Sequence, residues 1–177
     1  MTSRPATIET KRLLLISLLP EELEALIASD VERASKLAGV WVSPGWPADR
    51  EAREGLAWHF RHLVADPAHI PWRVRVVVER SSGSVVGAIN LKGPPDSNGD
   101  AEIGWGIVES CRRQGYAVEA TAAVMAWALS ISATVPSDNI ASQRIARRLG
   151  MTCTASSRRN LPLWQCQRPN PVSGASR

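Results

Sequence analysis

The most constraining feature of this sequence is residues 101–120, AEIGWGIVESCRRQGYAVEA, where a strand pattern changes to a helix pattern across a short basic turn. Residues 101–108 read as a strand, and residues 115–129 read as an amphipathic helix that packs on the sheet. A helix N-terminus presents unpaired backbone N–H groups and the positive end of the helix dipole. The segment therefore predicts an anion site where a strand leads into a helix.

The residues of the turn suit a phosphate or pyrophosphate. Gly115 permits close approach of the backbone to an anion, and Arg112 and Arg113 add guanidinium groups whose geometry matches phosphate oxygens. The neighbouring GWGIVE lacks the third glycine of a dinucleotide fingerprint, and no G-x-x-x-x-G-K-[ST] motif occurs in the chain. Rossmann and P-loop chemistry are therefore excluded.

The rest of the chain alternates between strand and helix patterns. Strands are expected at residues 8–16, 72–79, 85–91, 101–108, 131–135, 152–155 and 163–167, and helices from residue 20, in two pieces between 30 and 64, and at 115–129 and 140–149. The helix at 115–129 is expected to pack through Val118, Ala122, Met125 and Leu129. With 177 residues, we expect one α/β domain over residues 1–168 and a disordered tail at 169–177.

Several motifs in order carry a family resemblance. The pattern Arg112-x-x-Gly115-x-Ala117 is similar to the [Q/R]-x-x-G-x-[G/A] signature with which GNAT acetyltransferases bind the coenzyme A pyrophosphate. TKRLLL at residues 10–15 resembles the opening strand of RimJ/RimL-type enzymes, and DNIAS at 138–142 with LGM at 149–151 resembles their D-N-x-x-S and L-G-F/M segments. The chain thus resembles a RimJ/RimL-like GNAT N-acetyltransferase.

This resemblance implies a fold, a co-substrate and a binding site. The fold is the GNAT fold, a central mixed, mostly antiparallel sheet of six to seven strands flanked by about four helices. The co-substrate is acetyl-CoA, which donates its acetyl group to a primary amine. The residues expected to bind it are Ile107, Val108, Arg112, Arg113, Gln114, Gly115, Tyr116, Ala117 and Asn139. Ile107 and Val108 would pair their backbone with pantetheine where two strands splay apart.

Glu102 is the candidate general base. On a strand it shares one face with Gly104, Gly106 and Val108, which places a carboxylate at the end of a groove. The two glycines also suggest a bulge. The glutamate of the corresponding strand is the base in histone-acetylating GNAT enzymes, although the alignment to the phosphate turn differs by one residue. Glu102 as a solvated residue or as the partner of an arginine is the alternative.

Ser142 is the candidate acid that protonates the departing thiolate. Many GNAT members have a tyrosine four residues before the glycine that corresponds to Gly150, but here that residue is Ala146. The resemblance to RimL-like enzymes assigns the role to Ser142 or to water. Both Ser142 and Asn139 lie near a helix start, so a capping role is the alternative for each. Direct attack would then need Glu102 as base and a backbone N–H near Ile107 for the oxyanion.

The acceptor is expected to be a small amine or a peptide N-terminus, because the chain has no long acidic run to bind a basic protein tail. Trp41, Trp46 and Trp58 fall in the region that covers the acceptor side in GNAT folds, so they line its pocket or fill the core. The spacing of His59 and His62 does not favour a metal site.

Charge and cysteine content limit the partners. The net charge of +4 is compatible with nucleic acid or with an anionic cofactor, but the arginine clusters lack the interleaved aromatic residues and zinc-ligand spacing of a nucleic-acid module. Three cysteines without a C-x-x-C pair, and no signal or membrane-spanning run, indicate a cytoplasmic, disulfide-free protein without a membrane anchor. A homodimer is left open.

Two alternatives remain open at this stage. The first is a non-catalytic acyl-CoA-binding or regulatory module, because Ala146 replaces the usual acid. The second concerns the connection between residues 129 and 131, where only Ser130 separates helix from strand, although such loops usually need about 2 to 6 residues. Either the helix ends early or residues are absent from the sequence.

Overall fold

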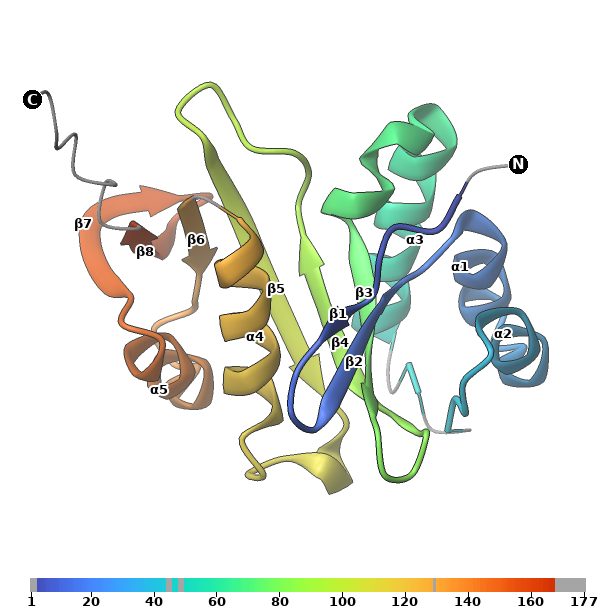
Figure 1. Ribbon diagram of the computed structural model, residues 1–177. Helices are drawn as coiled ribbons and strands as arrows, with labels where there is room; N and C mark the ends of the chain where they lie inside the picture. The colour runs from blue at the N-terminus through green and yellow to red at the C-terminus, as the bar shows by residue number, and fades with distance from the viewer. Residues whose placement is uncertain (1–2, 44–45, 48–49, 129, 168–177) are drawn as a thin grey trace, which may run out of the picture.

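The computed structural model describes residues 3–43, 46–47, 50–128 and 130–167 and shows one open sheet with helices on both faces (Figure 1). The strands are β1 (Ile8–Glu9), β2 (Leu13–Ser17), β3 (Val74–Glu79), β4 (Val85–Leu91), β5 (Asp100–Ile107), β6 (Ser130–Thr134), β7 (Thr152–Arg158) and β8 (Leu161–Gln167). The α-helices are α1 (Pro20–Ile27), α2 (Val31–Ala38), α3 (Arg50–Ala65), α4 (Tyr116–Trp127) and α5 (Ile140–Arg148), and the short 3₁₀ helices are η1 (Pro67–Trp72) and η2 (Glu109–Cys111). The expected tail at 169–177 lies outside the described residues.

The sheet has the order β1-β2-β3-β4-β5-β6-β8-β7. Neighbouring strands are antiparallel except for the parallel pair of β5 and β6. The expected mixed, mostly antiparallel sheet is confirmed, with eight strands instead of six to seven. One extra strand arises because residues 8–16 fold back on themselves: Thr10 N–H donates to the Leu13 carbonyl at 2.9 Å, and β1 pairs with β2.

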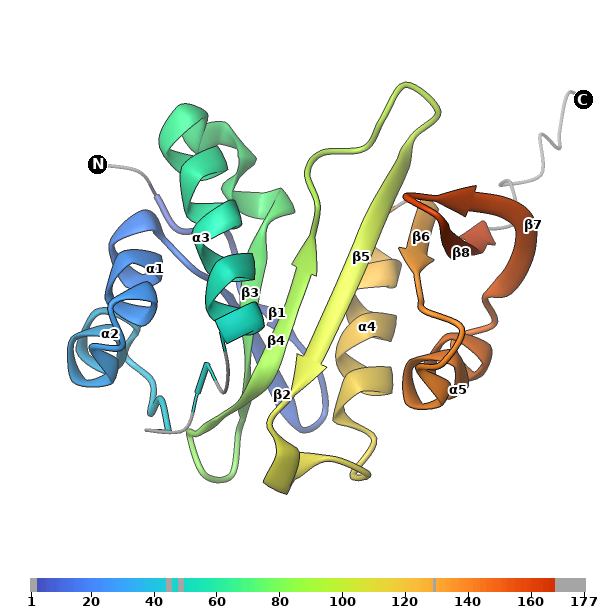
Figure 2. The same ribbon diagram turned by 180° about the vertical axis from the view of Figure 1, so that it is seen from behind.

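The two faces of the sheet carry separate cores. Helices α1, α2 and α3 cover one face and α4 covers the other, as the two opposite views show (Figures 1 and 2). On the α4 side, Ala101 and Ile103 of β5 join Ala120 and Val124 of α4 in one cluster. Because side chains alternate along a strand, Glu102, Gly104 and Gly106 face the α3 side. This arrangement separates the two surfaces of β5.

The buried side of α4 differs from the expected stripe. The buried residues are Tyr116, Ala117, Ala120, Thr121 and Val124, whereas Ala122 is exposed. Of the predicted stripe, Met125 packs partly buried against the core and Val118 is half-buried, whereas Ala122 is misplaced and Leu129 lies outside the described residues. The stripe was partly wrong because this helix is apolar almost all round, so its pattern does not specify which face meets the sheet. The small residues at 117 and 120 let the helix approach the sheet closely.

The backbone bears on two further local expectations. Helix α4 ends at Trp127 and Ala128 is extended, which agrees with an early helix end before β6; Leu129 lies outside the described residues. The expected bulge at Gly104 and Gly106 is absent, since β4 and β5 pair in continuous register from Leu91 with Ile103 to Gly87 with Ile107.

Candidate active site

The turn before α4 has the geometry of an anion site. Gly115 is the N-cap of α4 with φ of +83°, in the left-handed region that favours glycine. A β-carbon at this position would have only the Arg12 guanidinium within 4 Å, at 3.5 Å. Since the first N–H groups of a helix have no partner within the helix, the start of α4 offers donors to an anion without steric hindrance.

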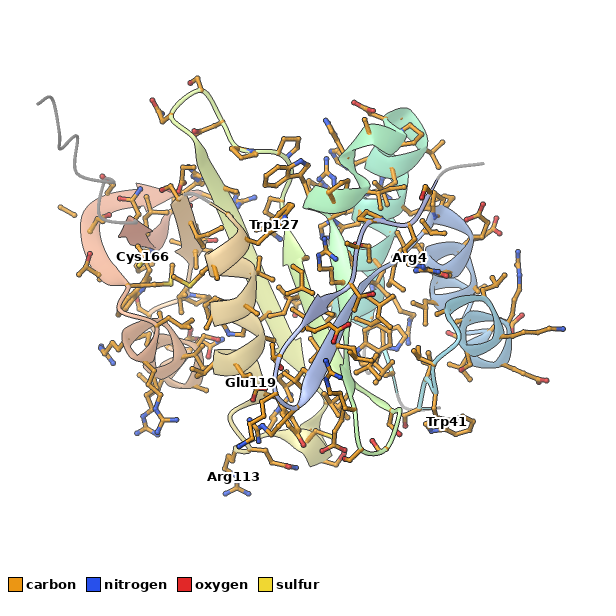
Figure 3. The ribbon with its side chains drawn as sticks, in the orientation of Figure 1. Arg4, Trp41, Arg113, Glu119, Trp127 and Cys166 are labelled. Atoms are coloured by element: carbon orange, nitrogen blue, oxygen red, sulfur yellow. The ribbon has the colours of Figure 1, made fainter. Side chains whose placement is uncertain are left out.

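The TKRLLL segment holds this turn in place, a role that motif comparison alone did not reveal. Arg12 Nε donates to Glu119 Oε2 at 2.7 Å, and Thr10 Oγ1 donates to Glu119 Oε1 at 2.6 Å. Arg12 Nη1 also donates to the Gln114 carbonyl at 3.1 Å, and its guanidinium lies 4.8 Å from the centre of the Tyr116 ring. Glu119 and Arg113 lie at the same end of α4 (Figure 3). The opening strand therefore fixes the start of α4.

Strand β5 loses its neighbour on one edge as it approaches this turn. Its pairing with β6 covers only Asp100 to Glu102, whereas β5 continues to Ile107. Val108 N–H donates to the Val86 carbonyl at 3.0 Å. Because bonded and non-bonded pairs alternate along antiparallel strands, the N–H of Ile107 points away from β4, toward the gap. Of the two residues expected to pair with pantetheine, Ile107 therefore has the free donor.

A cavity of about 1100 Å³ joins the open edge of β5 to the start of α4. Its lining residues come from β5, the turn, α4 and α5, together with Trp46 and Ala52 on the α3 side of the sheet. Of the residues predicted for coenzyme binding, those that line it are Ile107, Val108, Arg112, Arg113, Gly115, Tyr116, Ala117 and Asn139; Gln114 is not among them. The structure thus brings nearly the whole predicted set to one cavity.

Five arginines line this cavity. They are Arg112 and Arg113 of the turn and Arg144, Arg147 and Arg148 of α5. For the three on α5, the spacing of Ile145 and Leu149 predicts an exposed helix face, and all three are exposed in the structure. Within residues 3–43, 46–47, 50–128 and 130–167, none of the five forms an ion pair with an acidic side chain. The position of α5 beside α4 turns its arginines toward the phosphate turn, and such a concentration of unpaired charge suits a polyphosphate.

Helix α5 presents the candidate acid to the same cavity. Asn139 caps the helix by accepting the Ser142 N–H at 3.0 Å through its side-chain oxygen, so its capping role is confirmed. Asn139 and Ser142 both line the cavity. Ala146 is fully buried in the α4-side core and does not line it. The position at which many GNAT members have a tyrosine is therefore part of the core in this chain, and Ser142 lies at the cavity wall.

Tyr116 does not offer a free hydroxyl. Its hydroxyl donates to Glu79 Oε1, and this hydrogen bond raises the pKa of Tyr116 above its usual value. The same bond lowers the pKa of Glu79. The side chain is 4% exposed, so Tyr116 anchors the start of α4 to β3.

Glu102 lies on the α3-side face of β5, as expected, but it does not line the cavity. Its carboxylate accepts hydrogen bonds from Thr134 Oγ1 at 2.8 Å and from both Arg158 and Arg159. Four residues separate it from Gly106, which corresponds to about 13 Å along a strand. These contacts match the alternative in which Glu102 is the partner of an arginine, and they occupy the lone pairs that a base needs.

The α3-side face of β5 carries a polar cluster that the sequence did not reveal. Trp58 of α3 packs edge-on against His59 and lies 4.0 Å from the His62 ring. His59 is 3% exposed, and its Nδ1 has no hydrogen-bond partner. Burial first, then the charges of Lys92 and Arg73, lowers the pKa of His59 to about 3, against the opposing effect of the nearby Asn90 side chain. His59 is therefore neutral at physiological pH.

The tryptophans expected near the acceptor side have different positions. Trp46 is buried in the α3-side core and also lines the cavity, Trp58 belongs to the polar cluster, and Trp41 is 59% exposed. In the described part of the chain, no group of three or more His, Cys, Asp or Glu side chains could hold a metal ion. No helix among these residues is long and apolar enough to cross a membrane.

A strand that loses its partner beside a glycine-capped, arginine-lined helix start defines an acyl-CoA-dependent transferase. The family model for the GNAT acetyltransferase domain matches residues 12–152. An uncharacterized N-acetyltransferase of Bacillus subtilis, YjdG, is 32% identical over 149 residues, which cover 81% of this chain and 88% of that protein. The chain belongs to the GNAT acetyltransferase family and is an acetyl-CoA-dependent N-acetyltransferase.

Solved structures show the same fold. The ribosomal-protein-S5-alanine acetyltransferase of Vibrio fischeri aligns with a TM-score of 0.65 at 12% identity, covering 94% of this chain and 98% of that one. RimL, the ribosomal L7/L12 alpha-N-protein acetyltransferase, was solved in complex with coenzyme A; it aligns with a TM-score of 0.60 at 17% identity, covering 92% and 98%. The RimJ/RimL-like architecture is thus confirmed at the level of the fold.

Proposed function

We propose that this enzyme transfers the acetyl group of acetyl-CoA to a primary amine, on a small molecule or a peptide N-terminus, by direct attack without a covalent enzyme intermediate. The observation that carries the proposal is the continuous cavity from the arginine-lined start of α4 to the unpaired edge of β5. RimL, by its name an alpha-N-protein acetyltransferase of ribosomal L7/L12, supports the amine class, and the other ribosomal-protein acetyltransferase named above acts by its name on an alanine of protein S5.

The residues of the cavity fit coenzyme A. The backbone donors that follow Gly115, with Arg112 and Arg113, would hold the pyrophosphate. The arginines of α5 add unpaired positive charge beside them. The free edge of β5 around Ile107 would pair with the amides of the pantetheine arm, as another strand would. Bound acetyl-CoA supplies the thioester whose carbonyl carbon the amine attacks.

The chain's own groups have three tasks in the transfer. The N–H of Trp105, two residues before Ile107 on the same edge of β5, would stabilise negative charge on the carbonyl oxygen, while the N–H of Ile107 pairs with pantetheine. The hydroxyl of Ser142, at the cavity wall, would protonate the departing thiolate, with water as its substitute. An α-amine with a reference pKa of about 7.7 to 8.0 is partly neutral at physiological pH, so water can accept its proton.

Glu102 is proposed to hold the β7 to β8 hairpin through Arg159 instead of acting as the base. Glu102→Gln is expected to lower the free energy of unfolding by about 1 to 2 kcal/mol, because the arginine partners remain partly solvated. The pH-rate profile should keep its shape. Urea unfolding and pH-dependent kinetics of Glu102→Gln, Arg159→Gln and the double variant measure both effects.

The base hypothesis makes the opposite prediction for the same variants. Loss of a general base costs typically about 10² to 10⁴-fold in rate, and the loss is relieved at high pH where more amine is neutral. Such a profile in Glu102→Gln, without a matching effect in Arg159→Gln, would restore Glu102 as the base.

The proposed function itself is tested by acetyl-CoA turnover with a panel of acceptors. The panel contains small primary amines, peptides with a free N-terminus, and the same peptides with a blocked N-terminus and an internal lysine. We expect release of free thiol and acetylated product with the first two groups. Robust acetylation of internal lysines alone, without activity on free amines or N-terminal peptides, would contradict the proposal.

A further inference from the structure

The α3-side face of the sheet carries two cations without an acidic partner. Arg73, between η1 and β3, is 4% exposed, and its Nε has no hydrogen-bond partner. The Arg73 guanidinium and the Lys92 ammonium lie 5.0 and 5.7 Å from the centre of the Trp58 ring. Neither cation forms an ion pair with a carboxylate of the described residues: Asp66 acts on Arg73 and Glu102 on Lys92 only at longer range, and Glu102 is bound by Arg158 and Arg159. The Arg73 guanidinium also donates to the Lys92 carbonyl at 2.5 Å.

Buried polar atoms without partners point to a ligand at this place. Besides Arg73 Nε, the buried Nδ1 of His59 and the buried side-chain oxygen of Asn90 have no hydrogen-bond partner. Buried polar groups in proteins are nearly always hydrogen-bonded, to protein or to ordered water, so a polar group that enters this cluster would find three partners there. Trp58, which is only half-buried, supplies an aromatic wall. The cluster has the composition of a binding site: converging polar groups against an aromatic surface.

This cluster lies next to the cavity along the same face of β5. Gly106 lines the cavity, and a side chain there would meet no atom within 4 Å. Two residues earlier on the same face, a β-carbon on Gly104 would lie 3.1 Å from the Asn90 amide, so the Asn90 side chain covers Gly104. Two residues further, Lys92 N–H donates to the Glu102 carbonyl at 2.8 Å. An acceptor that runs from the reaction centre to Lys92 therefore passes over Gly106 and displaces the Asn90 amide.

We propose that Arg73, Lys92 and Trp58 form a subsite for a carboxylate of the acceptor, which is an acidic peptide N-terminus. This inference rests on the proposed function. The distance sets the position of the acid: four strand residues from Gly106 to Glu102 span about 13 Å. An extended peptide advances about 3.3 to 3.6 Å per residue, so this span corresponds to nearly four steps. The acidic side chain and the Lys92 side chain together bridge about one or two of these steps, which makes the acidic residue the third or fourth. The carboxylate of a free amino acid lies too close to its amine to reach Lys92.

Matched tetrapeptide amides test the proposal. One has serine at its N-terminus, glutamate as its third residue and alanine elsewhere, and its partner has glutamine in place of glutamate. A second pair places the exchange at the fourth residue, and a free amino acid with its amide forms the third pair. We expect kcat/KM to favour the acidic peptide by about tenfold in at least one peptide pair, since a hydrogen bond to a charged group typically provides this much. The amino acid pair should show no preference for the acid.

In Lys92→Gln, the ratio of kcat/KM for the acidic peptide to kcat/KM for the neutral peptide should fall to about one. In Lys92→Glu, the neutral peptide should be preferred. The matched control is Lys36→Gln, because Lys36 is an exposed lysine on α2, remote from the cluster. It should keep the tenfold preference. Added salt should weaken the preference of the wild-type enzyme. Arg73→Gln provides a second test, and coenzyme A affinity shows whether each variant is folded.

The outcomes separate this inference from the proposed function. Equal rates for the acidic and neutral peptides of both pairs, or a preference that Lys92→Gln and Arg73→Gln leave unchanged, would overturn the carboxylate subsite while acetyl transfer stands. A preference for the free amino acid over its amide, without one among the peptides, would contradict the assigned distance. Absence of transfer to every acceptor, with coenzyme A bound, would contradict the proposed function and this inference with it.

Discussion

Gly115→Glu is expected to weaken coenzyme A binding by at least about 100-fold, or roughly 2.7 kcal/mol. The substitution places a side chain at φ of +83°, where only glycine is unstrained. It also puts a carboxylate at the helix start where the pyrophosphate would bind, so that two like charges compete for the same N–H donors. Isothermal titration calorimetry with coenzyme A measures the loss.

A matched control separates strain from the binding effect. Gly39, which caps the C-terminal end of α2, also has a positive φ of +69° and open space around its β-carbon position. Gly39→Glu carries the same change in charge and a similar backbone strain, but it lies outside the cavity. It should cost stability of about 1 kcal/mol and leave coenzyme A affinity unchanged. Unchanged affinity in a folded Gly115→Glu protein would refute the site.

Those parts of the site that depend on neighbours in sequence could be predicted. The turn at Gly115 is local, because a left-handed residue at a strand-to-helix junction requires glycine. The cap formed by Asn139 is local as well, since a capping side chain reaches a backbone N–H only three residues further. Both are therefore visible as short motifs, and the structure places both at the cavity.

The rest depends on contacts between distant segments. The α5 arginines read as a solvated face until α5 is placed beside α4, which a helical pattern cannot specify. Glu102 looked like a base because its partners, Arg158 and Arg159, lie 56 and 57 residues away in sequence. The contacts among Trp58, Arg73 and Lys92 also join distant segments, because Trp58 lies in α3, Arg73 directly before β3 and Lys92 directly after β4. The alternation of residues along β5 shows which face carries the two glycines. It does not show which side chains of other elements lie over that face.

The polar cluster around His59 also makes the stability of the fold depend on pH. His59 has a folded pKa of about 3, mainly because of burial and secondly because Lys92 and Arg73 lie near it, whereas its unperturbed pKa is 6.5. The unfolded chain therefore binds a proton more readily than the folded one. The stability that follows from a neutral His59 is fully present above pH 6.5 and is lost as pH falls toward 3.

The expected loss of stability at low pH is large, and the variant His59→Leu is its control. Each pKa unit corresponds to 1.36 kcal/mol, so the free energy of unfolding should fall by roughly 3 kcal/mol between pH 6.5 and pH 4 through this residue alone. In His59→Leu, which replaces the imidazole with an uncharged side chain of similar size, that part of the decline should disappear. Urea unfolding of both proteins from pH 4 to pH 8 gives the difference directly, because the other titrating groups are common to both. Parallel curves across this range would show that His59 is solvated, contrary to its burial beside Lys92 and Arg73 described above.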